Sequence, residues 1–384
     1  MRTPNSVNTM RYDSSALDRR IKALRPLARE IVERSTDGLV LYGAGFLGDW
    51  ASKFLGDIGI TVSHFLDRNR EKTGGSLNGI RIEYPDKDSL AAPNAMLVSA
   101  RHAVTEVLQL VGDADYPVMS FDGFFVVQNY ERLIEIREKF LEDDQSIETF
   151  NAIITAMITG EVQHSLNVMQ KDMYFALPEF SGNFEEIYVD AGAFVGDTIE
   201  RFVWENLGTF KQIYAFEPGI RQYQAMQHRV SRLKLEWAFP PETVTLVHAG
   251  LSDENAEMTC TYTDDSPLRH GLTESGSAGS LNSVPVHTLD SFLEGKPISF
   301  LKVDVEGMEM PLLRGAAYTI RQHKPKLALC VYHYPSDLFE IPEYIRSLSK
   351  DYRFVLRQHA PVFGDFVMYC YVSGDTCAIE ATHV

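Results

Sequence analysis

The stretch YVDAGAFVGDT, Tyr188 to Thr198, decides the fold of the second half of this chain. It reads as an apolar strand ending at Asp190, then a loop with Gly192 and Gly196, then the start of a helix. Glycine lets the backbone approach a ligand closely, and the free N–H groups at a helix start can bind an anion. The stretch therefore predicts a ligand site at the carboxyl end of a strand in an α/β sheet.

Further strand signals follow this stretch, with helical segments between most of them. They are KQIYAFE, VTLVHA, ISFLKVD, KLALCVYH, RFVLRQH and DFVMYCYV. Only the short polar interval APVFGD separates the last two, which is too short for a parallel crossover, so they should pair as an antiparallel hairpin. A parallel sheet closed by an antiparallel carboxyl-terminal hairpin is the layout of the class I methyltransferase fold.

The first half shows a second, smaller α/β pattern. Apolar residues at helical spacing predict an amphipathic helix from Ser14 to Glu33. The stretch LYGAGFLG, Leu41 to Gly48, and a second strand ending at Asp67 form a β-α-β unit, which predicts a Rossmann-like domain. We expect a helical segment at residues 1–35, the Rossmann-like domain at 36–127, a helical connector at 128–182 and the methyltransferase-like domain at 183–384.

Composition narrows the classes of partner. The 384 residues carry a formal net charge of −17, which argues against a nucleic-acid partner. The four cysteines form no metal-binding motif, no apolar run is long enough to span a membrane, and no signal peptide is readable at the start. We expect a cytoplasmic protein without a membrane span, acting on a small-molecule or saccharide substrate; a homo-oligomer is left open.

Charges around the central loop favour a particular cofactor. Asp190 and Asp197 flank the glycines and would repel a pyrophosphate, whereas S-adenosylmethionine carries a cationic sulfonium and ammonium and a single carboxylate. Glu217 ends the next strand, where an acidic side chain can accept hydrogen bonds from ribose hydroxyls. The alternative for each acid is a turn cap or a solvated strand end. Their order along the chain favours the cofactor.

The amino-terminal glycine loop supports a different hypothesis. Its GAGFLG stretch allows a nucleotide to bind at Gly43, Gly45 and Gly48, with Asp67 at the end of the next strand. It could equally be a packing turn. The alternative function is thus a nucleotide-sugar or NAD(P)-binding protein acting through this domain, although no hydride-transfer set of the Ser/Tyr/Lys kind follows. A non-catalytic interaction protein is a third hypothesis.

The second half resembles the FkbM family of S-adenosylmethionine-dependent methyltransferases. The stretches that carry the resemblance are DAGAFVGDT, AFEP, HTLDSF, SFLKVDVEGMEMPLLRGA and VYHYPSDLFEIPEYI. Membership implies methyl transfer, most often to a hydroxyl oxygen on a saccharide, glycoconjugate or related natural product. The first half is similar to the sugar-nucleotide-binding domains of sugar acyltransferases. One departure is Phe194, which fills a position that many methyltransferases give to glycine.

These patterns predict a set of site residues. Strand alternation places Lys302, Asp304 and Glu306 on one face, where Lys302 should pair with Asp190 or Asp304. We expect His333 to act as the base and Asp304 as a base or an organising charge, with no metal required. Acceptor contacts are expected on loops such as 263–283. The residues expected to bind the cofactor are Asp190, Gly192, Ala193, Phe194, Gly196, Asp197, Thr198, Phe216, Glu217, Pro218, Gly250 and Asp304.

Overall fold

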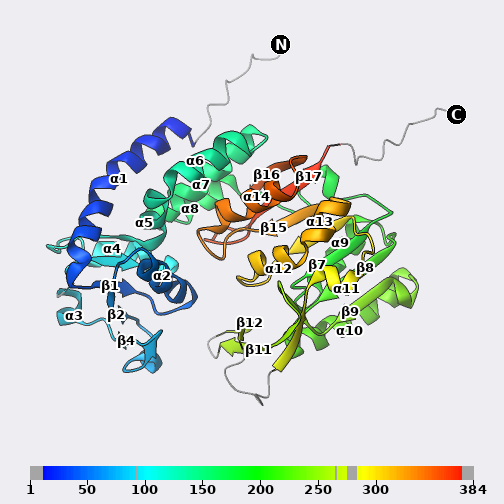
Figure 1. Cartoon of the computed structure of the whole chain (residues 1–384), viewed down its shortest axis with the longest axis horizontal. Helices are drawn as coiled ribbons and strands as arrows, with labels where there is room; N and C mark the ends of the chain where they lie inside the picture. The colour runs from blue at the N-terminus through cyan, green and yellow to red at the C-terminus, as the bar shows by residue number, and fades with distance from the viewer. Residues whose placement is uncertain (1–11, 92, 264–265, 275–282, 374–384) are drawn as a thin grey trace, which may run out of the picture. The chain divides into compact units, whose positions relative to one another are not determined.

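A computed structural model describes residues 12–91, 93–263, 266–274 and 283–373 (Figure 1). The chain divides into two compact units. The first unit contains Met1–Met169, Tyr334–Leu338 and Leu356–Asp365, and the second contains Gln170–His333, Phe339–Val355 and Phe366–Val384. Two short segments from the second half of the sequence therefore belong to the first unit.

The first unit is built on a six-stranded sheet in the order β3-β4-β2-β1-β5-β6. Strand β1 pairs in parallel with both β2 and β5, and β3 alone is antiparallel to its neighbour β4. This arrangement confirms the parallel α/β pattern that the sequence predicted. The strands are β1 (Leu39–Tyr42), β2 (Val62–Leu66), β3 (Ser76–Leu77), β4 (Ile80–Glu83), β5 (Met96–Val98) and β6 (Val118–Ser120).

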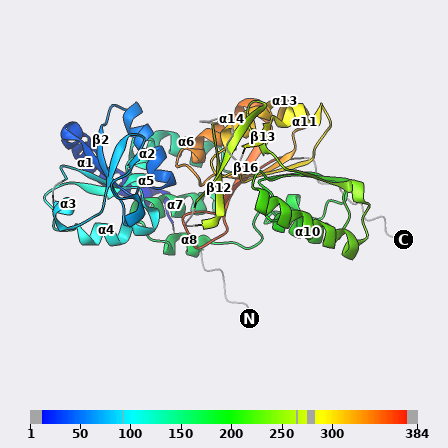
Figure 2. The ribbon, with the colours of Figure 1, turned by 90° about the horizontal axis from the view of Figure 1, so that it is seen from below.

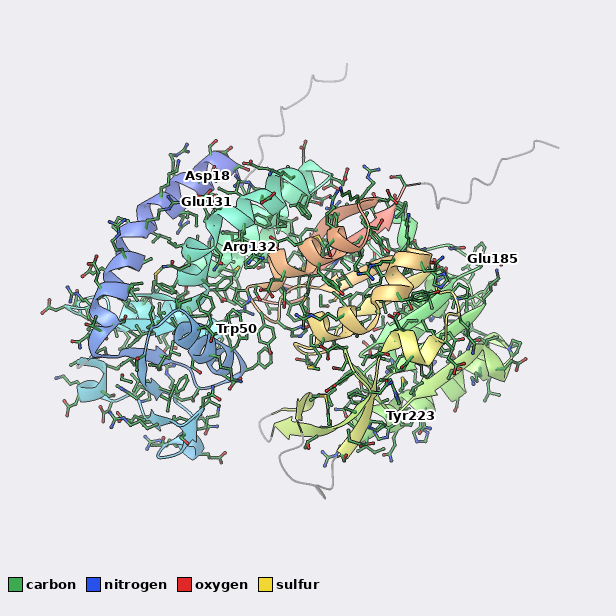
Figure 3. The ribbon with its side chains drawn as sticks, viewed as in Figure 1. Asp18, Trp50, Glu131, Arg132, Glu185 and Tyr223 are labelled. Atoms are coloured by element: carbon green, nitrogen blue, oxygen red, sulfur yellow. The ribbon has the colours of Figure 1, made fainter. Side chains whose placement is uncertain are left out.

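Helices cover this sheet, and the first is the amphipathic helix that the sequence predicted. Helix α1 begins after Asp13, whose side chain accepts a hydrogen bond from the N–H of Ala16 and so caps the helix. Figure 3 shows Asp18 on α1 close to α6, where Tyr130 and the buried Arg137 both donate to its carboxylate. The helices are α1 (Ser14–Arg34), α2 (Phe46–Asp57), α3 (Lys87–Ala91), α4 (Val104–Leu110), α5 (Phe121–Gln128), α6 (Tyr130–Lys139), α7 (Asp144–Thr159) and α8 (Gln163–Val168).

The two later segments of the first unit are held by specific contacts. The ring of Tyr334 stacks on Phe46 and Trp50 of α2, with ring centroids 5.0 and 5.4 Å apart. Arg357 donates to both carboxylate oxygens of Asp143, at 3.1 and 2.8 Å. Asp143 also caps α7, so this one carboxylate serves both the helix start and the inserted segment.

The second unit contains a seven-stranded sheet in the order β16-β17-β15-β14-β7-β8-β9. Strands β7, β8, β9, β14 and β15 are parallel to their neighbours in this set, and β17 is antiparallel to β15. This confirms the class I methyltransferase fold, including its antiparallel carboxyl-terminal strand. The strands are β7 (Ile187–Ala191), β8 (Gln212–Phe216), β9 (Val244–Val247), β14 (Phe300–Val303), β15 (Lys326–Cys330), β16 (Tyr352–Gln358) and β17 (Phe366–Val372).

Helices lie on both faces of this sheet, as its nearly continuous burial requires. Figure 2 shows α10 on one side and α11, α13 and α14 on the other. The strands bury side chains on both faces, and the aromatic rings of Tyr188, Phe202 and Phe300 pack together in one layer. The helices are α9 (Asp197–Glu205), α10 (Ile220–Trp237), α11 (Leu289–Leu293), α12 (Glu309–Gly315), α13 (Ala317–His323) and α14 (Asp337–Leu348).

A small four-stranded sheet, in the order β10-β13-β11-β12, precedes the fourth parallel strand. It consists of β10 (Gly250–Leu251), β11 (Ala256–Thr263), β12 (Ser266–Glu274) and β13 (Ser283–His287). The sequence prediction that 263–283 is loop was wrong for residues 266–274, which pair antiparallel with β11. Their mixed polar sequence lacks the apolar run by which a strand is recognised in a sequence.

Candidate active site

The central glycine loop turns sharply between β7 and α9. Gly192 has φ +78°, and a Cβ built on it would lie 1.8 Å from the carbonyl oxygen of Asp304, so no larger residue fits here without a backbone shift. Gly196, also at φ +78°, is the N-cap of α9. Phe194 takes φ +47°, a left-handed conformation that L-residues rarely adopt. Phe194, at a position where many methyltransferases were expected to have glycine, thus takes a glycine-like backbone conformation at a cost in strain.

Behind this loop lies a buried ion pair. Lys302 Nζ lies 3.0 Å from Asp190 Oδ1, and the two side chains are only 2% and 0% exposed. Lys302 also donates to the carbonyl oxygens of Gly192, at 2.6 Å, and Ala191, at 3.3 Å. Burial alone would lower the pKa of Lys302, but Asp190 and Asp304 raise it above its ordinary value, so Lys302 is charged. The predicted pairing of Lys302 with Asp190 is confirmed.

This pair changes the role of Asp190. Burial raises the pKa of Asp190, and Lys302 opposes that effect. A side chain with 0% exposure cannot touch a cofactor in this conformation. The expected direct contact is therefore not supported, because the carboxylate faces Lys302 and holds the loop from behind.

Glu217 also stabilises the loop. Its Oε2 accepts a hydrogen bond from the N–H of Phe194 at 2.9 Å, and its Oε1 accepts one from the N–H of Gly219 at 2.6 Å. The N–H groups of Gly192 and Ala193 donate to the carbonyl oxygen of Phe216, at the end of β8. Glu217 is 1% exposed, so it links the loop to the end of β8 and would reach a ribose only if this lining opened.

The other residues expected to bind a cofactor fall into two groups. Asp197 is exposed at the start of α9, beside buried Thr198, and Pro218 follows Glu217, where its carbonyl oxygen lies 3.0 Å from His248 Nε2. These lie at the carboxyl end of the sheet. Gly250 instead belongs to the small sheet, and a Cβ there would meet the Leu272 side chain at 2.5 Å.

Asp304, directly after β14, is held by two tyrosines. Tyr174 donates to Oδ2 at 2.7 Å and Tyr332 to Oδ1 at 3.1 Å. Burial would raise the pKa of Asp304, but Lys302, His333 and the two tyrosines together hold it below its ordinary value. Tyr174 is itself buried, and its φ of +69° is strained for a tyrosine. Asp304 is therefore a fixed, ionised carboxylate.

His333 lies three residues beyond the end of β15 and is surrounded by carboxylates. Its Nδ1 is 2.9 Å from Glu309 Oε1, and its Nε2 is 3.5 Å from Glu306 Oε2 and 3.8 Å from Asp304 Oδ1. Burial would lower the pKa of His333, but Glu309 chiefly, with Glu306 and Asp304, raises it well above its ordinary value. At neutral pH the imidazole is therefore mainly protonated, which the sequence did not indicate.

Asp304, Glu309 and His333 also form a group in which one potential ligand atom from each residue lies within 4.8 Å of the others. Carboxylate and imidazole ligands would suit several divalent cations. The charge on His333 balances part of the negative charge of this group.

Sequence reasoning missed Tyr174 and Glu309. Tyr174 precedes β7 by thirteen positions in an irregular segment, so no periodicity points to it. Glu309 was visible in the DVEGMEM run, but its burial against His333, at 1% exposure, depends on the tertiary fold. Asp304 and His333 end two of the stretches that the sequence predicted as strands, and the structure places His333 Nε2 3.8 Å from Asp304 Oδ1.

The amino-terminal loop brings its predicted residues together within the first unit. Asp67 Oδ2 accepts from the N–H of Ala44 at 2.8 Å, and Lys72 Nζ donates to the Ala44 carbonyl at 3.2 Å. A Cβ on Gly48 would lie 2.1 Å from the carbonyl oxygen of Gly43, whereas one on Gly45 would meet nothing within 4 Å. Gly43 and Gly48 thus have a packing role, and open space remains at Gly45. Within the described part of the chain, no helix combines the length and apolarity needed to cross a membrane.

Comparisons with known proteins show similarity to methyltransferases. Residues 190–356 match the model of the methyltransferase FkbM domain. A solved structure of methyltransferase FkbM from Methylobacillus flagellatus is 22% identical, covers 93% of this chain and 98% of its own, and superposes with a TM-score of 0.56. A putative methyltransferase from Streptococcus mutans, solved with S-adenosylhomocysteine (SAH), is 13% identical and covers 50% of this chain and 92% of its own, with a TM-score of 0.32.

Comparison with curated proteins finds no match. The Methylobacillus structure spans nearly the whole chain and shares its fold. The motif evidence and the family model coincide on the same strands, β7 to β16, and on the DVEG turn that carries Asp304. The chain therefore contains, at residues 190–356, a region that matches the methyltransferase FkbM domain.

Proposed function

We propose that this enzyme transfers the methyl group of S-adenosylmethionine to a hydroxyl oxygen on a saccharide, glycoconjugate or related natural product. The observation that carries the proposal is the position of Asp304 and His333 at the strand ends next to the glycine loop, with His333 Nε2 3.8 Å from Asp304 Oδ1. Asp304 packs directly against that loop, because its carbonyl oxygen would lie 1.8 Å from a Cβ built on Gly192. The proposed proton acceptor, His333, and the loop expected to hold the cofactor thus both lie next to Asp304.

The loop residues fit the cofactor. Gly192 to Gly196 provide a turn without side chains at its two glycines, and the first N–H groups of α9 lack partners within the helix, as at any helix start, so they suit the single carboxylate of S-adenosylmethionine. When bound, the cofactor supplies an electrophilic methyl group. Lys302 keeps the loop in shape by holding the carbonyl of Gly192.

The residues of this chain then align and deprotonate the acceptor. Alignment of the reacting atoms and exclusion of water are the main requirements of such a displacement. A hydroxyl is a weak nucleophile, so removal of its proton by His333 assists the reaction. Asp304, ionised and fixed by its tyrosines, stabilises the positive charge that His333 carries after it takes the proton.

Isothermal titration with SAH tests the cofactor assignment. The wild-type protein should bind it, and Gly192→Ala should bind at least about tenfold more weakly, since the new Cβ must displace the backbone at Asp304. Gly295→Ala is the matched control, because Gly295 also has a positive φ but open space around its Cβ. Absence of binding by the wild-type protein, or equal binding by both variants, would contradict the proposal.

A second proposal concerns the first unit. We propose that its glycine loop binds a nucleotide or nucleotide-sugar, supported by the open space at Gly45 and by Lys72 Nζ beside the loop. Mass spectrometry of small molecules released from the purified protein tests it. A retained nucleotide lost on Gly45→Trp would support the proposal, and its retention in that variant would contradict it.

A further inference from the structure

His333 and Glu309 form a pair that the proposed reaction does not yet explain. Glu309 is the first residue of α12 and is 1% exposed. Its Oε1 lies 2.9 Å from His333 Nδ1 and also accepts the N–H of Val305 at 3.0 Å. The carboxylate is thereby tied to the same DVEG turn that carries Asp304. The position of the imidazole is therefore fixed relative to Asp304.

The geometry distinguishes the two ring nitrogens. Nδ1 faces Glu309, whereas Nε2 faces Asp304 and Glu306 at 3.8 and 3.5 Å. Asp304 is partly exposed and the side chain of Glu306 is 45% exposed, so the Nε2 side is the one nearer to solvent-accessible groups. A neutral imidazole that donates from Nδ1 has its lone pair on Nε2. The ring of Tyr332, 4.2 Å from that of His333, packs against the imidazole and restricts it further.

We propose that Glu309 is a positioning residue that holds His333 with Nδ1–H toward Glu309 and the Nε2 lone pair toward the acceptor hydroxyl. This inference rests on the proposed methyl transfer. It assigns Glu309 no contact with substrate. The residue acts through His333, by fixing its tautomer and by stabilising its charged form.

The acceptor O–H bond breaks and its proton goes to His333 Nε2. The oxygen forms a bond to the methyl carbon as the carbon–sulfur bond breaks, and the electron pair of that bond remains on sulfur. His333 is then an imidazolium paired with Glu309 and later releases the proton to water.

The charges around His333 give this arrangement a pH dependence. Glu309, Glu306 and Asp304 face the ring, and Lys302 lies beyond Asp304. They raise the pKa of His333 despite its burial, so most of the enzyme at neutral pH holds the proton and cannot act as a base. Activity should therefore rise with pH until His333 is deprotonated.

Two substitutions separate orientation from charge. In Glu309→Gln the amide oxygen can still accept from Val305 and from His333 Nδ1, but the negative charge is gone. In Glu309→Ala both the accepting oxygen and the negative charge are gone. Glu185→Gln, labelled at its position in Figure 3, is the control, since Glu185 is an exposed acid paired with Lys211.

The direct measurement is an NMR pH titration of the full chain carrying ¹⁵N-labelled histidine, with the His333 signal assigned from His333→Gln. We expect wild-type His333 to titrate above its ordinary range and to keep the neutral form protonated at Nδ1. In Glu309→Gln the proton affinity of His333 should fall at least about tenfold, which is one pKa unit. Methyl transfer should rise at correspondingly lower pH in this variant, whereas Glu309→Ala should lower the plateau rate with KM for the cofactor unchanged.

Three results would overturn the inference. The first is a His333 titration unchanged by Glu309→Gln, and the second is a neutral imidazole protonated at Nε2. The third is broadening of the His333 signal by Mn²⁺ that Glu309→Gln abolishes, since the three side chains would then hold a cation. Failure of the proposed function is distinguishable, because it would appear as missing SAH binding in the wild-type protein, whatever His333 does.

Discussion

The buried pair of Lys302 and Asp190 gives a quantitative test of how the glycine loop is held. In Lys302→Met the chain keeps a side chain of similar length but loses the only charge that the structure places within ion-pair distance of Asp190 among the described residues. Removing one partner of a buried ion pair costs about 3–5 kcal/mol, because the other charge is left buried and uncompensated. The carbonyl oxygens of Ala191 and Gly192 lose a donor as well.

The expected size of the effect follows from the size of the unit. For a unit of about 200 residues, each 1 kcal/mol shifts the melting temperature by about 2–4 °C, so the variant should melt about 6–20 °C lower. The loss should grow as pH rises. Without Lys302 the pKa of Asp190 is raised further, and the ionised form, which dominates at higher pH, is the destabilising one.

Differential scanning calorimetry at two pH values measures this effect. The double variant Lys302→Met with Asp190→Asn removes both charges while keeping the shape of Asp190. It should recover at least half of the lost stability, because no buried charge remains unpaired. A double variant no more stable than Lys302→Met, or a Lys302→Met protein within about 1 kcal/mol of wild type, would refute the reasoning.

Two further predictions concern neighbouring contacts. Tyr174→Phe removes the 2.7 Å hydrogen bond to Asp304, so the pKa of Asp304 should rise, and it should rise less in Tyr332→Phe, whose bond is 3.1 Å long. A ¹³C NMR titration of the Asp304 carboxylate measures both shifts, and equal titrations in all three proteins would exclude this role. Gly48→Ala should lower the free energy of unfolding of the first unit by about 1–3 kcal/mol in urea, because its Cβ would lie 2.1 Å from the Gly43 carbonyl oxygen. Gly45→Ala, the control, should change this free energy by less than about 1 kcal/mol. The reverse order would contradict the packing role of Gly48.

Much of the second unit could be predicted from the sequence because its signals are local. Apolar strands separated by helical segments set the parallel sheet. The short interval before Phe366 predicted that β16 and β17 pair, and β17 does lie beside β16 and runs antiparallel to β15. Strand alternation correctly placed Lys302 and Asp304 on one face and anticipated the pair with Asp190.

The prediction failed where an outcome depends on burial. Nothing local distinguishes an acid that faces a ligand from one that faces a buried lysine, so the sequence could not show that Asp190 has 0% exposure and pairs with Lys302. The pKa of His333 could not be anticipated either, because it depends on Glu309 at the start of α12, which only the tertiary fold brings beside the loop of His333. Segment 266–274 was expected to be loop because its mixed polar sequence has no apolar run.

The discontinuous make-up of the first unit has a consequence for how the chain folds during synthesis. The stacking of Tyr334 on Phe46 and Trp50, and the hydrogen bond from Arg357 to Asp143, each join an early residue to a late one. Tyr334 and Arg357 are synthesised only after most of the second unit. The first unit therefore cannot form all of its contacts before the second unit is made, although amino-terminal domains usually fold first. A fragment that stops at Met169 would lack the Tyr334 ring that stacks on Phe46 and Trp50 and the Arg357 guanidinium that pairs with Asp143, so truncation should destabilise the unit that precedes the cut.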